Sequence, residues 1–298
     1  MRNILTIDVE EYFHPSEVQR SIPIEEWSGL PSRVEASTDR ILELLDQRST
    51  RATFFVLGWV ADRHPGLIRR IAEAGHEVAC HSYAHQLVYS LTPEEFREDT
   101  VRAVNAIGNA VGVRPTLYRA PSFSITNRSL WALEILVECG FQFDSSIFPI
   151  SHDRYGIPGF KRHAQVLRTP SGPIFEVPVA TTELMSGTIV PVGGGAYMRI
   201  LPYRYMAAGI RRVNRTEKRP ACIYLHPWEI DVEQPLLAEG FVSQMRTYTG
   251  IAGMAKKLER LVTDFQFAPM STVYPNPCES ALEKVTLTSV GTNQIGVR

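Results

Sequence analysis

Cysteine is scarce in this sequence, and the four copies are widely scattered: Cys80, Cys139, Cys222 and Cys278. This scatter argues against a disulfide framework and against a cysteine-based zinc site. Cys80 and Cys222 each lie in an apolar run, where a buried free thiol is the usual state. A metal site, if there is one, must therefore use other ligands.

Long apolar runs and an excess of charge are also missing. No segment approaches the ~20 apolar residues that a transmembrane helix needs. The first residues, MRNILTIDVEEYF, lack the long apolar core and the small-residue cleavage site of a signal peptide. The formal net charge is only −1, which argues against nucleic acid or a membrane surface as a partner. We therefore expect a soluble, cytoplasmic globular protein.

What the sequence does have is an alternation of short β-branched runs with amphipathic segments of helical period. The run Thr92-Pro93, with Glu95 three residues after Thr92, is a strong start signal for one of these helices. The predicted strands span residues 3–8, 52–58, 76–81, 116–121, 141–146, 174–181, 221–227 and 265–271, and the predicted helices span residues 33–47, 66–75, 92–112, 127–140, 203–213 and 252–265.

This alternation indicates a parallel sheet, either closed into a barrel or open and doubly wound. No glycine-rich phosphate loop follows the first strand, which counts against a nucleotide-binding open sheet. We therefore predict an α/β fold, a distorted TIM-like (β/α) barrel, over residues 1–274. A polar tail without a clear period follows at residues 275–298. The pattern blurs between about residues 147 and 200, a segment that could supply a lid or the interface of a homo-oligomer.

Polar residues recur at the ends of the predicted strands, which is where such barrels carry their chemistry. In chain order they are Asp8 with Glu10, His81, Arg119, Asp144 and His226. Each follows an apolar run and begins a loop. A random scatter of polar residues would not keep choosing that position, so these residues are the candidates for a functional site.

Asp8 and Glu10 are two residues apart, so on an extended strand they project to the same face. Two carboxylates on one face repel each other unless a cation or a proton separates them. The pair suits one metal ligand and one base, although a solvated acidic turn is an equally good interpretation of these residues alone. Glu11 should point away, and we expect Glu11 and His14 to be surface residues or supports of the ligands.

His81 and His85, in HSYAH, meet on one side if the chain turns helically after the strand. Two imidazoles plus one carboxylate leave coordination positions open for water and substrate, as in catalytic zinc sites. H-x-x-x-H alone is a weak signal, and two unrelated surface histidines would give it too. The carboxylates at the neighbouring strand end favour the metal.

The remaining candidates suit proton transfer. His226, in IYLHPWEID, follows an apolar strand and precedes a proline, and an imidazole near a carboxylate can transfer protons at neutral pH. A packed histidine bonded to backbone is the commoner fate of a single His. Trp228 could line the same pocket. Arg119, opposite Asp8, would hold that carboxylate ionised and oriented, or else form an ordinary surface ion pair.

Taken together, the motifs TIDVEE, HSYAH, YRAPSF, FDSSIFP and YLHPWE, in this order, resemble the polysaccharide deacetylase family, also called the NodB-homology group or carbohydrate esterase family 4. The stretches VGGGAYMRILPY and HPWEID are similar to those of deacetylases associated with exosortase and exopolysaccharide gene clusters. The resemblance covers residues 1 to about 274.

The resemblance implies a distorted (β/α) barrel, a divalent metal, usually Zn²⁺ and sometimes Co²⁺, and hydrolysis of N-acetyl groups on a sugar substrate. It implies that Asp8 is the general base and His226 the general acid. The other implied roles are Glu10, His81 and His85 as metal ligands, Ser82 as brace of their loop, Arg119 as the residue that orients Asp8, Asp144 as the residue that tunes His226, the Ser122 N–H as oxyanion donor, and Leu225 and Trp228 as walls of the acetyl pocket.

The chain departs from the common family motif, which has two adjacent aspartates where this chain has Asp8, Glu10 and Glu11. Glu11 as the ligand is the less favoured alternative, and a glutamate ligand reaches further than the aspartate of the common motif. Two rival functions also stay open. The first is hydrolysis of small cyclic amides or imides, as in allantoinase-like enzymes, and the second is a non-catalytic carbohydrate-binding partner.

Overall fold

The centre of the fold is a curled sheet of mostly parallel strands, in the order β10–β1–β2–β3–β4–β5–β7–β6–β12, with β11 beside the start of β1. The computed structural model describes residues 1–298 except 20–21, 185, 276, 278–283 and 287–298. The strands are β1 (Asn3–Val9), β2 (Thr53–Val56), β3 (Glu77–Cys80), β4 (Leu117–Tyr118), β5 (Phe143–Asp144), β6 (Gln165–Thr169), β7 (Gly172–Glu176), β10 (Cys222–Leu225), β11 (Phe267–Ala268) and β12 (Lys284–Thr286), with β8 (Thr181–Glu183) and β9 (Ile189–Pro191) forming a separate hairpin.

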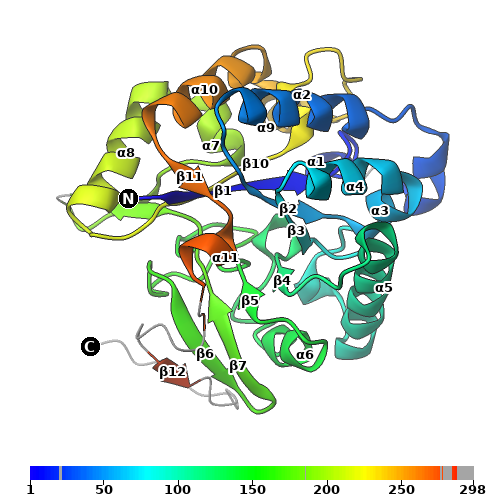
Figure 1. Ribbon diagram of the computed structural model, residues 1–298, viewed down its shortest axis with the longest axis horizontal. Coiled ribbons are helices and arrows are strands. Elements are labelled where there is room, and N and C mark those ends of the chain that lie inside the picture. Colours follow the sequence, from blue (N-terminus) through cyan, green and yellow to red (C-terminus); the bar gives the residue numbers. More distant parts are fainter. Residues whose placement is uncertain (20–21, 185, 276, 278–283, 287–298) are drawn as a thin grey trace.

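Helices cover the convex side of this sheet, with α2 and α10 along one edge and α3 to α5 around the other (Figure 1). The helical elements are α1 (Ser16–Gln19), η1 (Ile24–Gly29), α2 (Val34–Gln47), α3 (Gly58–Arg63), α4 (Pro65–Glu73), η2 (Val88–Ser90), α5 (Pro93–Val111), η3 (Pro121–Phe123), α6 (Ala132–Glu138), α7 (Gly195–Ile200), α8 (Tyr203–Arg215), η4 (Pro227–Ile230), α9 (Phe241–Tyr248), α10 (Ile251–Asp264) and α11 (Met270–Val273).

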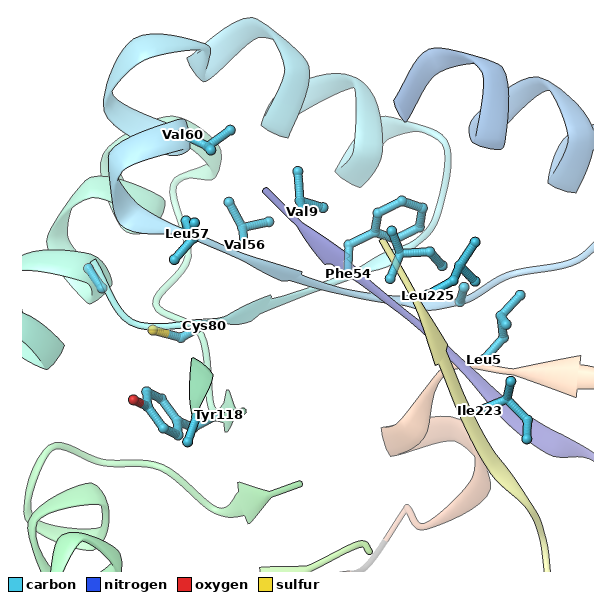
Figure 2. Packing of buried hydrophobic residues seen from close by; sticks show 14 of the residues in the cluster. Leu5, Val9, Phe54, Val56, Leu57, Val60, Cys80, Tyr118, Ile223 and Leu225 are labelled. Atoms are coloured by element: carbon cyan, nitrogen blue, oxygen red, sulfur yellow. The ribbon is translucent and has the colours of Figure 1, made fainter. Parts of the chain in front are cut away.

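Because side chains alternate along a strand, the sheet has two distinct faces. The helix-facing side chains include Leu5, Val9, Phe54, Cys80 and Tyr118, which pack with the helices in the main core (Figure 2). The inner face is defined by Ile4, Phe55, Ala79, Leu117 and Phe143, which form a second buried cluster. Only a residue on the inner face can reach the inside of the curled sheet.

The predicted strands and helices are confirmed, with ends shifted by a few residues. The start signal of α5 is a full capping box, because Thr92 Oγ1 accepts the Glu95 N–H (3.2 Å) and Glu95 Oε2 accepts the Thr92 N–H (2.8 Å). The curled parallel sheet with helices outside confirms the α/β, distorted (β/α) barrel-like fold. Between the described strands the ladder stays open and is not a closed TIM barrel.

The sequence pattern missed the hairpin of β6 and β7, which hangs from one end of the sheet (Figure 1). Only a strand at residues 174–181 is predicted there, and β7 begins earlier, at Gly172. The turn runs from Thr169 to Gly172, where Gly172 has φ +135°, a backbone angle that glycine adopts readily.

The expectation that Cys80 and Cys222 are buried free thiols is confirmed. Cys139 is free and half-buried, whereas Cys278 lies outside the described residues. Among the helices that the structure describes, none is long and apolar enough to cross a membrane. Of the predicted polar tail, the backbone of β12 pairs in parallel with β6, and most other residues after 275 are outside the described part.

Candidate active site

A cavity of about 510 Å³ opens where the carboxyl ends of the inner strands meet. Asp8 comes from the end of β1, with Glu10 just after it, while His81 follows β3 and His226 follows β10. All four side chains line the cavity, together with His85. The topology therefore brings together residues that are up to 218 positions apart in the chain.

Glu10, His81 and His85 form a compact group at the bottom of this cavity. Their nearest potential ligand atoms lie within 4.8 Å of one another. The Oε2 atom of Glu10 is 2.9 Å from Nε2 of His85, and the three residues are at most 3% exposed. The other carboxylate oxygen of Glu10, Oε1, accepts a hydrogen bond from the indole Nε1–H of Trp228 (2.9 Å). The carboxylate is thus fixed in place from the opposite side.

The loop that carries the two histidines is not helical, which corrects the predicted helical turn. Ser82 and His85 have φ angles of +65° and +51°, in the left-handed region that costs non-glycine residues energy. Ser82 Oγ accepts the backbone N–H of His85 (3.1 Å), so Ser82 does brace this loop. Asp99 of α5 accepts the backbone N–H groups of the two residues between Ser82 and His85, Tyr83 (2.8 Å) and Ala84 (3.0 Å). Tertiary contacts, not helical spacing, bring the imidazoles together.

His81 is oriented by a backbone carbonyl. Its Nδ1 lies 2.8 Å from the carbonyl oxygen of Arg119, and because a carbonyl only accepts, Nδ1 carries the proton. The lone pair is then on Nε2. Burial lowers the pKa of His81 to about 4, against the opposing charges of Asp8 and Glu10, so the imidazole is neutral at neutral pH. A neutral imidazole held by a carbonyl is the usual state of a metal ligand.

The residues present fit a divalent metal. Glu10 Oε2 is buried and, although it lies 2.9 Å from His85 Nε2, it accepts no well-aligned hydrogen bond from the described residues, so one oxygen of a buried carboxylate is left for another ligand. Burial would raise the pKa of Glu10, but the charges of His85 and His226 outweigh it and hold the pKa well below its usual range. One carboxylate and two imidazoles match catalytic zinc sites, in which protein ligands leave positions open.

Asp8 is held by the buried guanidinium of Arg119. Arg119 Nη1 donates to Asp8 Oδ1 (2.7 Å) and to Thr6 Oγ1 (2.6 Å), and Nη2 donates to Ser145 Oγ (2.9 Å). The Arg119 side chain is fully buried against the Phe55 ring, 4.2 Å away. Burial alone would lower the pKa of Arg119, but the Asp8 charge raises it, so the guanidinium stays charged. Arg119 lies where the sequence places it, opposite Asp8.

His226 faces both carboxylates. Its Nε2 lies 3.8 Å from Asp8 Oδ2 and 3.6 Å from Glu10 Oε1, and its ring stacks on Trp228 with centroids 5.1 Å apart. Burial would lower the pKa of His226, but the charges of Glu10, Glu229 and Asp8 outweigh it and raise the pKa to about 9. The imidazole can therefore carry a proton at neutral pH while the carboxylate of Glu10 is ionised.

Two residues of the site were missed by the sequence interpretation. Glu229 Oε2 accepts both the backbone N–H (2.9 Å) and the Nδ1–H (3.0 Å) of His226, and its Oε1 accepts from Arg199 Nε (2.6 Å). The glutamate three residues after His226, at the start of a helical turn, resembles a capping box and could have revealed Glu229. Arg199 lies in α7, inside the stretch VGGGAYMRILPY, but no pattern in that stretch assigns it a role at the site.

The predicted role of Asp144 is wrong in its geometry. In the sheet register, Asp144 is level with Tyr118 and Glu176, so it shares the helix-facing side with the Tyr118 side chain. Its carboxyl group accepts a hydrogen bond from Ser146 Oγ and interacts with the carboxyl group of Glu176. The carboxylate that hydrogen-bonds to the imidazole of His226 belongs to Glu229. Because side chains alternate along a strand, the residue after Asp144 faces inward and Asp144 itself does not. Its position at the strand end was therefore not enough to place it in the site.

The assignment of Leu225 to the acetyl pocket fails for the same reason. Leu225 pairs in register with Ile7 and packs in the helix-facing core beside Leu5 and Phe54 (Figure 2). The inner-face neighbours along the strand are Tyr224 and His226, and both line the cavity, as does Trp228. Tyr224 is therefore the strand residue that forms the pocket wall.

Glu11 and His14 are both buried, so neither is a surface residue. Glu11 turns away from the cavity, and its carboxylate accepts the Arg33 N–H (3.0 Å) and the Ser32 hydroxyl. His14 Nδ1 accepts the Glu11 N–H (3.1 Å), and its ring stacks on that of His85 with centroids 6.4 Å apart. In the structure Glu11 is outside the ligand group, and His14 supports one ligand from behind.

Ser122 lines the cavity on a strained turn. Its φ of +51° and ψ of +28° are left-handed, and Phe123 follows with φ +52°. The Ser122 hydroxyl lies 2.9 Å from that of Ser16, and among the described residues its backbone N–H makes no hydrogen bond. Residues held in such conformations often belong to functional sites. The backbone N–H is therefore available to a ligand in the cavity.

Two family matches divide the chain. Residues 29–143 match the polysaccharide deacetylase family, and residues 145–275 match a domain of unknown function (DUF3473). His81, His85 and Arg119 fall in the first match. Asp8 and Glu10 precede both matches. The second match contains His226 with its partners.

Curated relatives match over a shorter segment. The peptidoglycan-N-acetylglucosamine deacetylase of Bacillus cereus is 33% identical over 98 residues, which is 33% of this chain and 36% of that protein. The chitooligosaccharide deacetylase of a Bradyrhizobium species is 34% identical over 100 residues, which is 33% of this chain and 43% of that protein. The match therefore spans less than half of either relative.

The fold extends over nearly the whole chain. The crystal structure of a Mycobacterium smegmatis protein assigned to the polysaccharide deacetylases has a TM-score of 0.66 at 20% identity, covering 96% of this chain and 94% of that one. This likeness shows a common fold. The chemistry must be argued from the site itself.

Proposed function

Because this chain belongs to the polysaccharide deacetylase family through residues 29–143, we propose that it is a metal-dependent hydrolase that removes N-acetyl groups from an amino-sugar polysaccharide or its oligosaccharide precursor. The observation that carries the proposal is the meeting of Asp8, His226 and the group of Glu10, His81 and His85 in one cavity. A base, an acid and a ligand set together are what amide hydrolysis needs.

The metal would be held by Glu10, His81 and His85, and Zn²⁺ suits this ligand set, with Co²⁺ as a substitute. When bound, a divalent cation polarises the acetyl carbonyl and lowers the pKa of a water molecule. The likeness of VGGGAYMRILPY and HPWEID to deacetylases of exopolysaccharide clusters supports an exopolysaccharide, or a precursor of one, as the substrate.

The chain's own residues would divide the proton transfers. Asp8, oriented by Arg119, takes a proton from the water that attacks the acetyl carbon. The Ser122 N–H stabilises the negative oxygen of the tetrahedral intermediate. As the C–N bond breaks, the Nε2–H of His226 protonates the leaving nitrogen. Acetate and a free amino sugar result.

Acetate release tests this proposal. The protein would be given Zn²⁺ or Co²⁺ and a panel of N-acetylhexosamine oligomers and small cyclic amides, with His81→Ala beside the wild type. Because hydrolysis of a cyclic amide opens its ring and frees no acetate, ring opening is measured for those compounds and acetate for the sugars. We expect acetate from the sugars, no ring opening, and loss of acetate release in His81→Ala. Hydrolysis of the cyclic amides alone would replace the proposal by an imidase function. Absence of release from protein that holds its metal would contradict an N-deacetylase of such oligomers.

A further inference from the structure

A buried chain of hydrogen bonds leads from His226 to α7, and all of its members lie in the segment that matches a domain of unknown function, residues 145–275. His226 Nδ1 contacts Glu229 Oε2 (3.0 Å), and Glu229 Oε1 contacts Arg199 Nε (2.6 Å). Glu229 is 0% exposed and Arg199 is 3% exposed. This ion pair has therefore been taken out of water next to the cavity.

A buried pair of charges is costly unless further hydrogen bonds satisfy its partners, and each of the three guanidinium nitrogens of Arg199 has an acceptor. The remaining Arg199 donors reach the backbone carbonyls of Arg246 (2.7 Å) and Thr249 (2.9 Å), at the end of α9. The guanidinium also lies 5.3 Å from the ring of Trp228, which in turn stacks on His226. Contacts with the end of α9 and with η4 thus fix Arg199 of α7, and Arg199 in turn holds the glutamate that binds the imidazole.

The chain determines which imidazole nitrogen faces the cavity. An ionised carboxylate only accepts hydrogen bonds, so Glu229 keeps a proton on Nδ1 of His226. Nε2 is then the atom directed at the carboxylates of Asp8 (3.8 Å) and Glu10 (3.6 Å). A group in the cavity can exchange a proton with Nε2 alone.

We propose that Glu229 and Arg199 are positioning residues that hold His226 with Nε2 toward the substrate nitrogen, so that residues 145–275 supply the proton-donating part of the active site. The inference rests on the proposed function. In the step that it governs, the C–N bond of the tetrahedral intermediate breaks, its electron pair stays on nitrogen, and the His226 Nε2 proton moves to that nitrogen. The imidazole regains a proton from solvent before the next turnover.

Substrates with different leaving groups test the inference. Deacetylation of an N-acetylglucosamine oligomer needs protonation of the amine, whereas 4-nitrophenyl acetate loses its leaving group without a proton. We expect Glu229→Gln and Arg199→Met to lower kcat for the amide by ~10–100-fold, the scale of lost supporting contacts at metal sites, with KM and ester hydrolysis near wild type. Arg199→Lys keeps a cation but not the three-way contact, so its kcat for the amide should lie between those of wild type and Arg199→Met.

A matched control and a spectroscopic readout separate positioning from simple loss of structure. Glu217 pairs with Arg162 (2.8 Å) and Arg219 (2.6 Å) in the same segment but does not line the cavity, so Glu217→Gln should leave both kcat values unchanged. In metal-free protein, ¹H–¹⁵N spectra should show the Nδ1–H of His226 in wild type and its loss or shift in Glu229→Gln.

The possible outcomes show whether the positioning role fails or the proposed function fails. Equal slowing of amide and ester, or an unchanged amide kcat in Glu229→Gln, would overturn the positioning role. An unchanged His226 spectrum in Glu229→Gln would also overturn it. If wild type released no acetate from any amino sugar, the proposed function would fail, while the spectra would still support or refute the contact between Glu229 and His226.

Discussion

The two sides of the cavity use different means to hold an imidazole. On the ligand side, His81 is held by a backbone carbonyl and is neutral, because burial lowers its pKa to about 4. On the other side, His226 is held by the carboxylate of Glu229, and the surrounding negative charges raise its pKa to about 9 against the effect of burial. A carbonyl partner suits a ligand lone pair, and a carboxylate partner suits a proton donor.

The two sides of the cavity also come from different segments of the sequence. The ligand histidines lie in the part that matches the polysaccharide deacetylase family, and His226 lies in the part that matches a domain of unknown function. Each side should therefore fail in its own way when it is altered. Changes on the ligand side should cost metal and activity together, and changes on the donor side should cost turnover only.

The largest effect is expected for His81→Ala, because it removes a ligand. Zinc affinity should fall by more than the ~10–100-fold that loss of a supporting residue costs, and turnover should fall to background. Competition with a chelator and acetate release measure the two quantities. His64→Gln, a histidine outside the cavity, is the matched control. Full zinc binding by His81→Ala would remove this residue from the ligand set.

Glu10→Gln and Glu11→Gln form a matched pair that sharpens the ligand side. Glu10→Gln should weaken zinc binding, because the variant loses the charge that faces His85, although its amide oxygen can still accept from Trp228. Glu11→Gln should bind zinc as wild type does, since its carboxylate contacts Ser32 and Arg33 instead. Equilibrium dialysis gives both affinities. The reverse order would make Glu11 the ligand.

Asp144→Asn tests whether the donor side is confined to the inner face. Because Asp144 points to the helix-facing side and contacts Glu176, kcat and its pH dependence should stay close to wild type. Glu229→Gln, measured beside it, should lower kcat for the amide. An equal loss of kcat in both variants would mean that Asp144 acts on His226 after all.

The carboxyl pair on the helix-facing side should affect stability more than turnover. Burial raises the pKa of Asp144 and, together with the Asp144 charge, raises the pKa of Glu176 well above its usual range. Raised folded pKa values mean that the stabilising effect is complete below the unfolded values, near pH 4, and is lost as pH rises through the folded ones. Wild type should therefore lose unfolding free energy from this pair as the pH rises above the unfolded values.

Glu176→Gln removes one of the titrating groups from this pair. Its loss of unfolding free energy with rising pH should be smaller than in wild type, since each unit of pKa difference between the folded and unfolded states is worth about 1.4 kcal/mol. Denaturant unfolding at several pH values measures the difference. Parallel pH curves for the two proteins would show that Glu176 does not contribute to this loss.

The order of strands and helices could be predicted from the sequence because each has a clear period and, in α5, a clear cap. The ends of β1, β3, β4 and β10 then located Asp8, His81, Arg119 and His226. Position at a strand end does not say which face a side chain joins, however. For this reason the sequence interpretation wrongly assigned Asp144 and Leu225 to the cavity. Comparing each residue with its register neighbour would have corrected both.

Contacts between distant segments left little trace in the sequence. Arg199 is 30 positions from Glu229, and their pairing depends on how α7 packs beside η4. The loop around His85 depends on Asp99 from α5 and on left-handed residues, neither of which the H-x-x-x-H spacing reveals. Glu229 alone carried a local signal, its place three residues after His226.

The most direct test of the division between the two sides is His226→Ala, with zinc affinity, amide turnover and ester turnover measured on one preparation. We predict zinc affinity and 4-nitrophenyl acetate hydrolysis near wild type, and amide turnover lower by ~10²–10⁴-fold, the usual scale of general acid catalysis. Loss of zinc together with activity, or equal slowing of amide and ester, would contradict the separation of metal binding from proton donation.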